Sequence, residues 1–144
     1  MTNPRDKGKR GEYLCRNLLR DHTGLKWERI PSSGALPYLK GDLYVPNQNN
    51  KYCVEVKNYK DPVVSEKIFT QLRSNGLILW WNKVVKQAAR MEAKPILFFK
   101  HNRSPFYAAV QDKPKNSNYM YLNWIGAYVM LAEDFLTKEN PSFV

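Results

Sequence analysis

The stretch GDLYVPNQNNKYCVEVKNYK, residues 41–60, joins two apolar segments through a polar turn and carries charged residues inside the second segment. Segments 42–45 and 51–59 flank PNQNN, a cluster of turn-forming residues, so the pattern predicts a β-hairpin. Successive side chains of a strand point to opposite faces, and Glu55 and Lys57 therefore point the same way. Burying charge in a strand is costly unless the charge is paired or binds a metal. This hairpin therefore calls for a functional explanation.

The predicted hairpin also brings an acid on its first strand, Asp42, close to Glu55 and Lys57. Two carboxylates on adjacent strands suit a hard cation such as Mg²⁺, which prefers oxygen ligands. The neighbouring lysine can hold a water molecule or meet a phosphate oxygen. A metal in such a site lowers the pKa of bound water and neutralises charge on a phosphorus centre. The tripeptide E-V-K by itself also fits an exposed hairpin with a simple charge pair.

The composition favours a globular domain that meets a polyanion. The 144 residues are 43% hydrophobic, and 23 Lys plus Arg against 13 Asp plus Glu give a formal net charge of +10. Nucleic acid is the first partner that such a balance indicates, and a merely basic soluble protein is the alternative. Cys15 and Cys53, with His22 and His101, lack the spacing of a zinc site or a disulfide framework, so both thiols are expected to be reduced and in the core.

The N-terminus carries no apolar stretch and the longest apolar runs are too short to span a bilayer. We therefore expect no membrane association and a cytoplasmic location in a prokaryotic cell, with a phage-encoded protein in its host's cytoplasm as one form of this.

Hydrophobic periodicity predicts one domain, residues 1–144, with a mobile basic segment at 1–10. Gly24 is a plausible stop for the first helix. The expected helices cover 9–21, 64–73, 77–93 and 133–139, and the expected strands cover 25–30, 42–45, 51–59, 95–100, 104–111, 119–124 and 127–131. This order predicts an α/β protein with a central mixed β-sheet flanked by helices.

The hairpin resembles the signature of the PD-(D/E)XK nucleases, with Gly41 in place of the usual proline. Asp42, Glu55 and Lys57 match the three catalytic positions of that signature. A second resemblance is to the archaeal-type Holliday junction resolvases. It rests on KGKRGEYLCRNLL (7–19), RIPSSGALPYLKGD (29–42) and WWNKVVKQAARMEAKPILFFK (80–100), and it covers roughly 7–110 with extra sequence at 62–76.

Within the first of those segments Glu12 matches a metal-associated glutamate of the resolvases, and in the second Arg29 and Ser32-Ser33-Gly34 match an arginine and a serine-glycine loop. The resemblance implies a restriction-endonuclease-like fold that acts as a homodimer on four-way DNA junctions, in DNA recombination and repair. It implies hydrolysis of a phosphodiester by water, which leaves a 5′-phosphate and a 3′-hydroxyl.

The resemblance also implies residue roles. Asp42 and Glu55 would bind Mg²⁺, with Mn²⁺ able to substitute, helped by the main-chain carbonyl of Val56. Glu12 would act through a water molecule, and Lys57 would orient the attacking water or stabilise the transition state. A serine of the loop would touch the scissile phosphate. The residues expected at the site or on the DNA are Glu12, Asp42, Glu55, Lys57 and Ser33 for catalysis, and Lys7, Lys9, Arg10, Arg29, Ser32, Lys40 and Lys60 for DNA contact.

Several interpretations stay open at this point. Glu12 can also be a solvated acid near a helix start, and Trp80 and Trp81 can stack on unpaired bases or pack in the core or in a dimer. The same site would also serve a restriction-type, repair or exonuclease-type enzyme acting on duplex or single-stranded DNA. A non-catalytic DNA-binding or assembly module, whose hairpin acids are structural, is the alternative from another class.

Overall fold

A computed structural model describes residues 3–31, 38–66, 70 and 76–144, and its centre is a seven-stranded sheet of order β1-β2-β3-β4-β5-β7-β6. The strands are β1 (Glu28–Arg29), β2 (Leu43–Tyr44), β3 (Tyr52–Tyr59), β4 (Lys94–His101), β5 (Tyr107–Val110), β6 (Met120–Leu122) and β7 (Ala127–Leu131). Strands β3 and β4 pair in parallel, and the other neighbours in the sheet pair antiparallel. The predicted mixed sheet and the hairpin of β2 and β3 are confirmed.

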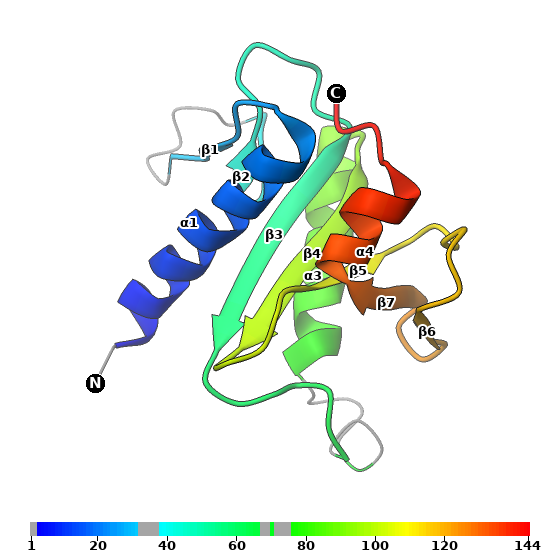
Figure 1. The fold of residues 1–144 in the computed structure, drawn as a ribbon. Helices are drawn as coiled ribbons and strands as arrows, with labels where there is room; N and C mark the ends of the chain where they lie inside the picture. The colour runs from blue at the N-terminus through cyan, green and yellow to red at the C-terminus, as the bar shows by residue number, and fades with distance from the viewer. Residues whose placement is uncertain (1–2, 32–37, 67–69, 71–75) are drawn as a thin grey trace.

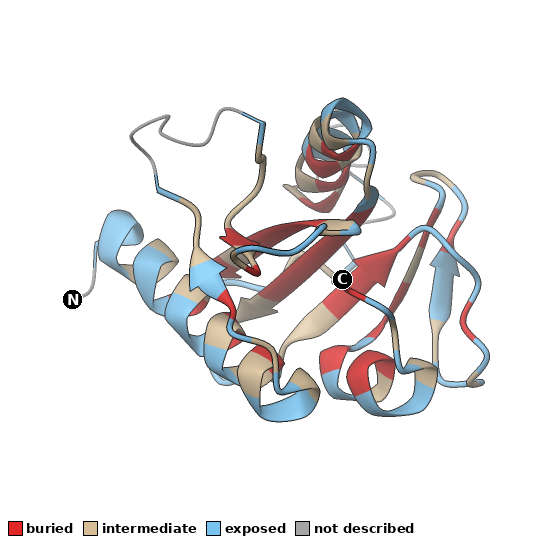
Figure 2. Cartoon of the chain, turned by 90° about the horizontal axis from the view of Figure 1, so that it is seen from above, coloured by how far each residue is buried: buried red, intermediate tan, exposed pale blue. Residues whose placement is uncertain are grey.

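Helices cover both faces of this sheet, as Figure 1 and Figure 2 show. Helix α1 (Pro4–Thr23) lies on one face together with the short C-terminal pair α4 (Ala132–Asp134) and η1 (Phe135–Glu139). Helix α3 (Gly76–Met91) lies on the opposite face. The sheet therefore separates two hydrophobic clusters, and β3, the third strand in the sheet, contributes Val54 to the first and Cys53 to the second.

Helix α1 begins earlier than the sequence pattern predicts. Asn3 caps it, since its side-chain oxygen accepts a hydrogen bond from the Asp6 amide at 2.9 Å, and Pro4 occupies the first turn. Residues 4–10, which we expected to be a mobile basic segment, therefore form the first two turns of the helix. The predicted stop is confirmed, because Gly24 has φ +70° and its amide donates to the Arg20 carbonyl at 3.0 Å.

Helix α3 confirms the helix predicted at 77–93. Its buried residues are Leu77, Trp81, Val84 and Ala88. Trp81 is 2% exposed and belongs to the core, whereas Trp80 lies at the helix edge with its ring stacked 4.8 Å from that of Tyr59. Both tryptophans have intramolecular packing partners, in line with the packing interpretation. Most of the predicted helix 64–73 lies outside the described residues.

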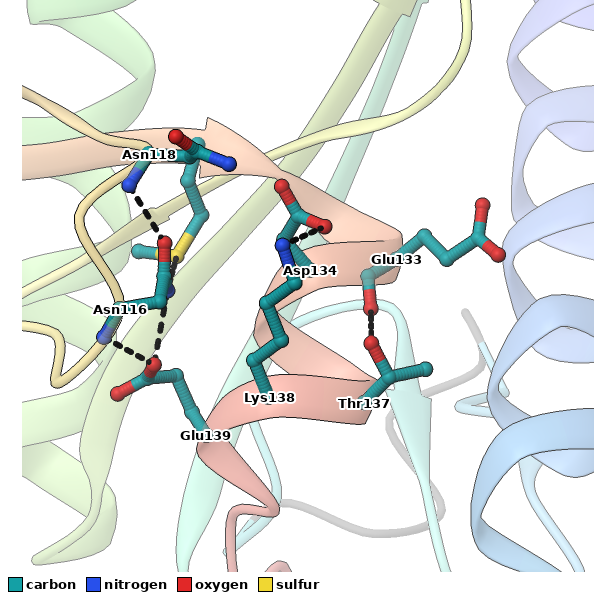
Figure 3. Close-up of polar contacts among 8 residues, drawn as sticks. Asn116, Asn118, Glu133, Asp134, Thr137, Lys138 and Glu139 are labelled. Atoms are coloured by element: carbon teal, nitrogen blue, oxygen red, sulfur yellow. Dashed lines mark hydrogen bonds and ion pairs between the residues drawn. The ribbon is translucent and has the colours of Figure 1, made fainter.

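The C-terminal quarter of the chain completes the sheet. Strands β6 and β7 extend it beyond β5, and the helical turns that follow pack on the α1 side. Glu139 of η1 fixes the loop between β5 and β6. Its carboxylate accepts hydrogen bonds from the Asn116 amide and side chain at 2.9 and 2.8 Å (Figure 3), and another from the Lys115 amide at 2.6 Å. No helix within the described ranges is long and apolar enough to cross a membrane.

Candidate active site

The candidate site lies where β2 begins beside β3. The Asp42 amide donates to the Val54 carbonyl at 2.7 Å, and the Asp42 carbonyl accepts from the Ile30 amide at 2.9 Å. Two residues further along β3, a side chain takes the place of the backbone partner: Asp42 Oδ2 accepts a hydrogen bond from the Val56 amide at 2.8 Å. Since the N–H and C=O of a strand residue point to the same edge, the Val56 carbonyl faces this side too.

Gly41 sets the backbone that delivers Asp42 to this edge. Its φ is +93°, which proline cannot adopt because its ring holds φ near −65°. A Cβ at Gly41 would also lie 2.5 Å from the Val54 carbonyl oxygen. The glycine that replaces the usual motif proline is therefore required by the local backbone.

Gly41→Ala is expected to lower the free energy of unfolding by about 2–4 kcal/mol, from the positive φ and from the displaced backbone together. Urea denaturation measures this loss. Gly126→Ala is the matched control, since Gly126 has φ +73° and nothing within 4 Å of its Cβ position, so it should lose only about 1 kcal/mol. Equal losses in the two variants would show that the contact with Val54 does not matter.

Glu55 is the centre of the charged cluster. Its side chain is 3% exposed, and its Oε1 lies 3.5 Å from the Lys57 amine and 3.2 Å from the Lys83 amine. Lys57 comes from the same strand and the same face, as strand alternation predicts. Lys83 comes from α3. The sequence alone does not point to Lys83, because nothing there distinguishes it from the other 22 Lys and Arg residues.

Electrostatics couple the two acids. Burial, followed by the charge of Glu55, raises the pKa of Asp42 to about 7, although the Val56 amide bond and Lys57 act the other way. The same surroundings keep the nearby thiols protonated: burial, then Glu55 and Asp42, raises the pKa of Cys53 to about 12. Cys15 and Cys53 are free and buried, as predicted. The Asp42 carboxyl therefore holds its proton more strongly than an ordinary aspartate does.

Glu12 stands beside this cluster but is held by another partner. Its Oε1 accepts a hydrogen bond from Arg29 Nε at 3.1 Å, and the Arg29 guanidinium also lies 4.9 Å from the Tyr13 ring centre. Glu12 is close enough to contribute to the raised pKa of Asp42. Over the described part of the chain, no group of three His, Cys, Asp or Glu side chains is close enough to hold a metal together.

The oxygen donors that do converge fit a hard divalent cation. The Val56 amide bond uses Asp42 Oδ2, and the contacts with Lys57 and Lys83 use Glu55 Oε1, so these contacts do not occupy Asp42 Oδ1 or Glu55 Oε2. The Val56 carbonyl faces the same edge. Two carboxylate oxygens and a carbonyl, with water completing the shell, form the kind of oxygen set that Mg²⁺ takes in proteins.

The remaining predicted DNA contacts come from helix α1 and from the two ends of the hairpin. Lys7 and Lys9 lie on α1, where the Lys7 amine contacts the Asn102 side chain, and Arg10 follows them. Burial, then Lys7 and Arg10, lowers the pKa of Lys100, so cations gather at this end of β4. Lys40 and Lys60 flank the hairpin, and Lys60 is exposed. Ser32 and Ser33 lie outside the described residues.

The family model that matches this chain makes it a PD-(D/E)XK nuclease, and the mixed sheet with helices on both faces agrees with the α/β architecture expected for that class. The chain belongs to the family described as "Phage putative PDDEXK endonuclease", whose model matches residues 3–139.

Two individual proteins extend this comparison. "Protein D14" of Escherichia phage T5 is 45% identical over 112 residues, which cover 74% of this chain and 69% of that protein. The solved structure of Hjc, a Holliday junction resolvase from the archaeal hyperthermophile Archaeoglobus fulgidus, is 14% identical, with a TM-score of 0.46, 88% of this chain covered and 89% of that one.

Proposed function

We propose that this nuclease is a Mg²⁺-dependent, structure-selective DNA endonuclease that resolves four-way or otherwise branched junctions by phosphodiester hydrolysis. The observation that carries the catalytic part is the buried Glu55, held by two lysines next to an Asp42 whose pKa is raised to about 7. Buried acids with a raised pKa beside a specific charge partner are typical of functional sites, and this supports a catalytic role.

Asp42, Glu55 and the Val56 carbonyl would hold the metal, and Glu12 would reach it through a water molecule once Arg29 releases it. Bound there, Mg²⁺ or Mn²⁺ lowers the pKa of water and neutralises charge on the phosphate. Lys57, whose side chain is 20% exposed, orients the attacking water or stabilises the transition state. Water attacks phosphorus in line, the bond to the 3′ oxygen breaks, and that oxygen takes a proton and leaves as the 3′-hydroxyl.

DNA as the substrate is supported by the family and by the formal net charge of +10. Contacts to the phosphate backbone are assigned to Lys7, Lys9, Arg10, Arg29, Ser32, Lys40 and Lys60, and Ser33 is placed at the scissile phosphate. The preference for junctions rests on the resemblance of segments within 7–110 to the archaeal-type resolvases. Residues 1–144 would form one nuclease domain, which acts as a homodimer in the cytoplasm of a phage-infected cell.

The substrate preference is tested by incubating the protein with Mg²⁺ and a labelled four-way junction, a linear duplex or a single strand. We expect paired, symmetric nicks near the branch point of the junction and at least about 10-fold slower cutting of the others. Glu55→Ala, purified in the same way, controls for contaminating nucleases.

Each other pattern points to a different enzyme. Degradation from DNA ends, or cutting of linear duplex at the junction's rate, would assign the site to an exonuclease, restriction or repair nuclease instead. Tight binding without cleavage of any substrate would leave a non-catalytic DNA-binding module.

A further inference from the structure

The second amine on Glu55, that of Lys83, has no part in the chemistry assigned so far. Lys57 and Lys83 both reach the same carboxylate oxygen, but their surroundings differ. The Lys57 side chain is 20% exposed and lies within the site, whereas the Lys83 side chain is 54% exposed and enters from the solvent side. The Lys57 amine is thus enclosed with the acids, and the Lys83 amine lies between Glu55 and the solvent.

Helix α3 places Lys83 there firmly. The helix is fixed to the sheet by Trp81 and Val84, which flank Lys83 closely in sequence and are 2% and 0% exposed. One turn before Lys83, the Trp80 ring stacks on Tyr59 of β3 at 4.8 Å. A side chain carried by a packed helix holds its position more closely than one carried by a loop, so the contact of Lys83 with Glu55 follows from the fold.

Charge balance shows what Lys83 does in each state of the site. Without metal, the carboxylates of Asp42 and Glu55, when ionised, are matched by the ammonium groups of Lys57 and Lys83. A divalent cation bound by the two carboxylates would neutralise Glu55 in place of Lys83. The site would then carry an excess of positive charge near the Lys83 amine. A phosphodiester carries one negative charge, and its hydrolysis builds up a second in the transition state.

We propose that Lys83 is a phosphate-binding catalytic residue, and that its amine stays paired with Glu55 until metal and DNA bind at the site. Its ammonium then turns from Glu55 Oε1 to a non-bridging oxygen of the phosphate being cut. This inference rests on the proposed function, namely metal-dependent cleavage of DNA at this site. Lysine suits the role because it is a compact point charge on a flexible stem and binds phosphate from several directions.

The test compares Lys83→Met with Lys86→Met. Methionine keeps much of the stem without the charge, and Lys86 is an exposed lysine on the same helix for which no contact to Glu55 is found among the described residues. Affinity for a labelled four-way junction is measured in EDTA and in Ca²⁺, which replaces Mg²⁺ without supporting cleavage. Single-turnover cleavage is then measured in Mg²⁺.

For Lys83→Met we expect unchanged affinity in EDTA, because Glu55 holds the amine away from DNA, and about 10-fold weaker affinity in Ca²⁺. The slope of log affinity against log salt should fall by about 0.9 in Ca²⁺ alone. Cleavage should drop at least about 10-fold, and Lys83→Arg should restore part of it. Lys86→Met should change affinity equally in EDTA and Ca²⁺ and leave cleavage within about 2-fold.

Three results would overturn the inference: a Lys83→Met enzyme that cleaves at the normal rate, an equal loss of affinity in EDTA and Ca²⁺, or a loss of metal binding by calorimetry, which would make Lys83 a support for Glu55 only. In all three, cleavage by the unaltered protein shows that the proposed function still stands. An unaltered protein that cleaves no DNA with Mg²⁺ or Mn²⁺ overturns both.

Discussion

Glu55→Gln is expected to reduce DNA cleavage on the order of 10³-fold while DNA binding persists. The substitution keeps the size of the side chain but removes one of the two carboxylates available to a metal. It also deprives Lys57 and Lys83 of their shared anion. Single-turnover cleavage of labelled DNA with enzyme in excess measures the loss, and calorimetry should show that the heat of divalent-metal binding disappears.

Two further measurements make this result specific. Affinity for DNA in EDTA should stay equal or rise, because a negative charge near the phosphates is gone. Glu28→Gln is the matched control: Glu28 pairs with Arg20 at 2.8 Å, and its side chain is 49% exposed. That variant should cleave normally. A Glu55→Gln protein that still binds metal and cuts DNA would remove Glu55 from the proposed centre.

The metal-free protein is expected to lose stability as the pH rises from about 5 to 8, because of Asp42. The pKa of this carboxyl is raised from 3.8 to about 7 in the folded chain. A raised acid pKa stabilises the folded state below the unfolded pKa, and that stabilisation disappears as the pH rises through the folded pKa. The slope for one such group approaches about 1.4 kcal/mol per pH unit, or roughly 3–6 °C in Tm for a chain of this size.

Thermal melts at several pH values, with and without Mg²⁺, test this expectation. Asp42→Asn is the control, since its side-chain oxygen can still accept the Val56 amide bond but does not titrate. The difference in Tm between the two proteins should grow in favour of Asp42→Asn as pH rises, and Mg²⁺ should close it at pH 8 in the unaltered protein. Parallel melting curves for both proteins across this range would contradict the raised pKa.

Local sequence signals account for much of the fold and, within the candidate site, for the grouping of Asp42, Glu55 and Lys57. Alternation along β3 places Glu55 and Lys57 on one face, and the PNQNN turn brings Asp42 alongside, because these relations depend only on strand geometry and a short loop. Hydrophobic periodicity misses the start of α1 at Pro4, because the basic first turns of the helix carry no apolar stripe.

The contacts that local patterns miss are those between elements. Lys83 meets Glu55 across 28 positions of sequence, because α3 crosses the face of the sheet that carries Glu55. Glu12 and Arg29 pair across 17 positions, where α1 packs beside β1. Periodicity predicts that α3 is a helix but not how it is rotated against the sheet, where Leu77, Trp81, Val84 and Ala88 are buried. Contacts of this kind depend on how the helices pack against the sheet, which local sequence patterns do not determine.

The parallel pairing of β3 with β4 has a consequence for the protein during its synthesis. Glu55 lies opposite Leu97, and Lys57 lies opposite Phe99. The strand that carries both charges therefore has no central neighbour until the ribosome has released the chain to about His101. Since domains fold as their chains emerge, we expect ribosome-bound fragments that end before β4 to lack nuclease activity. A cell making this protein would thus meet its nuclease activity only after at least the first 101 residues have been synthesised.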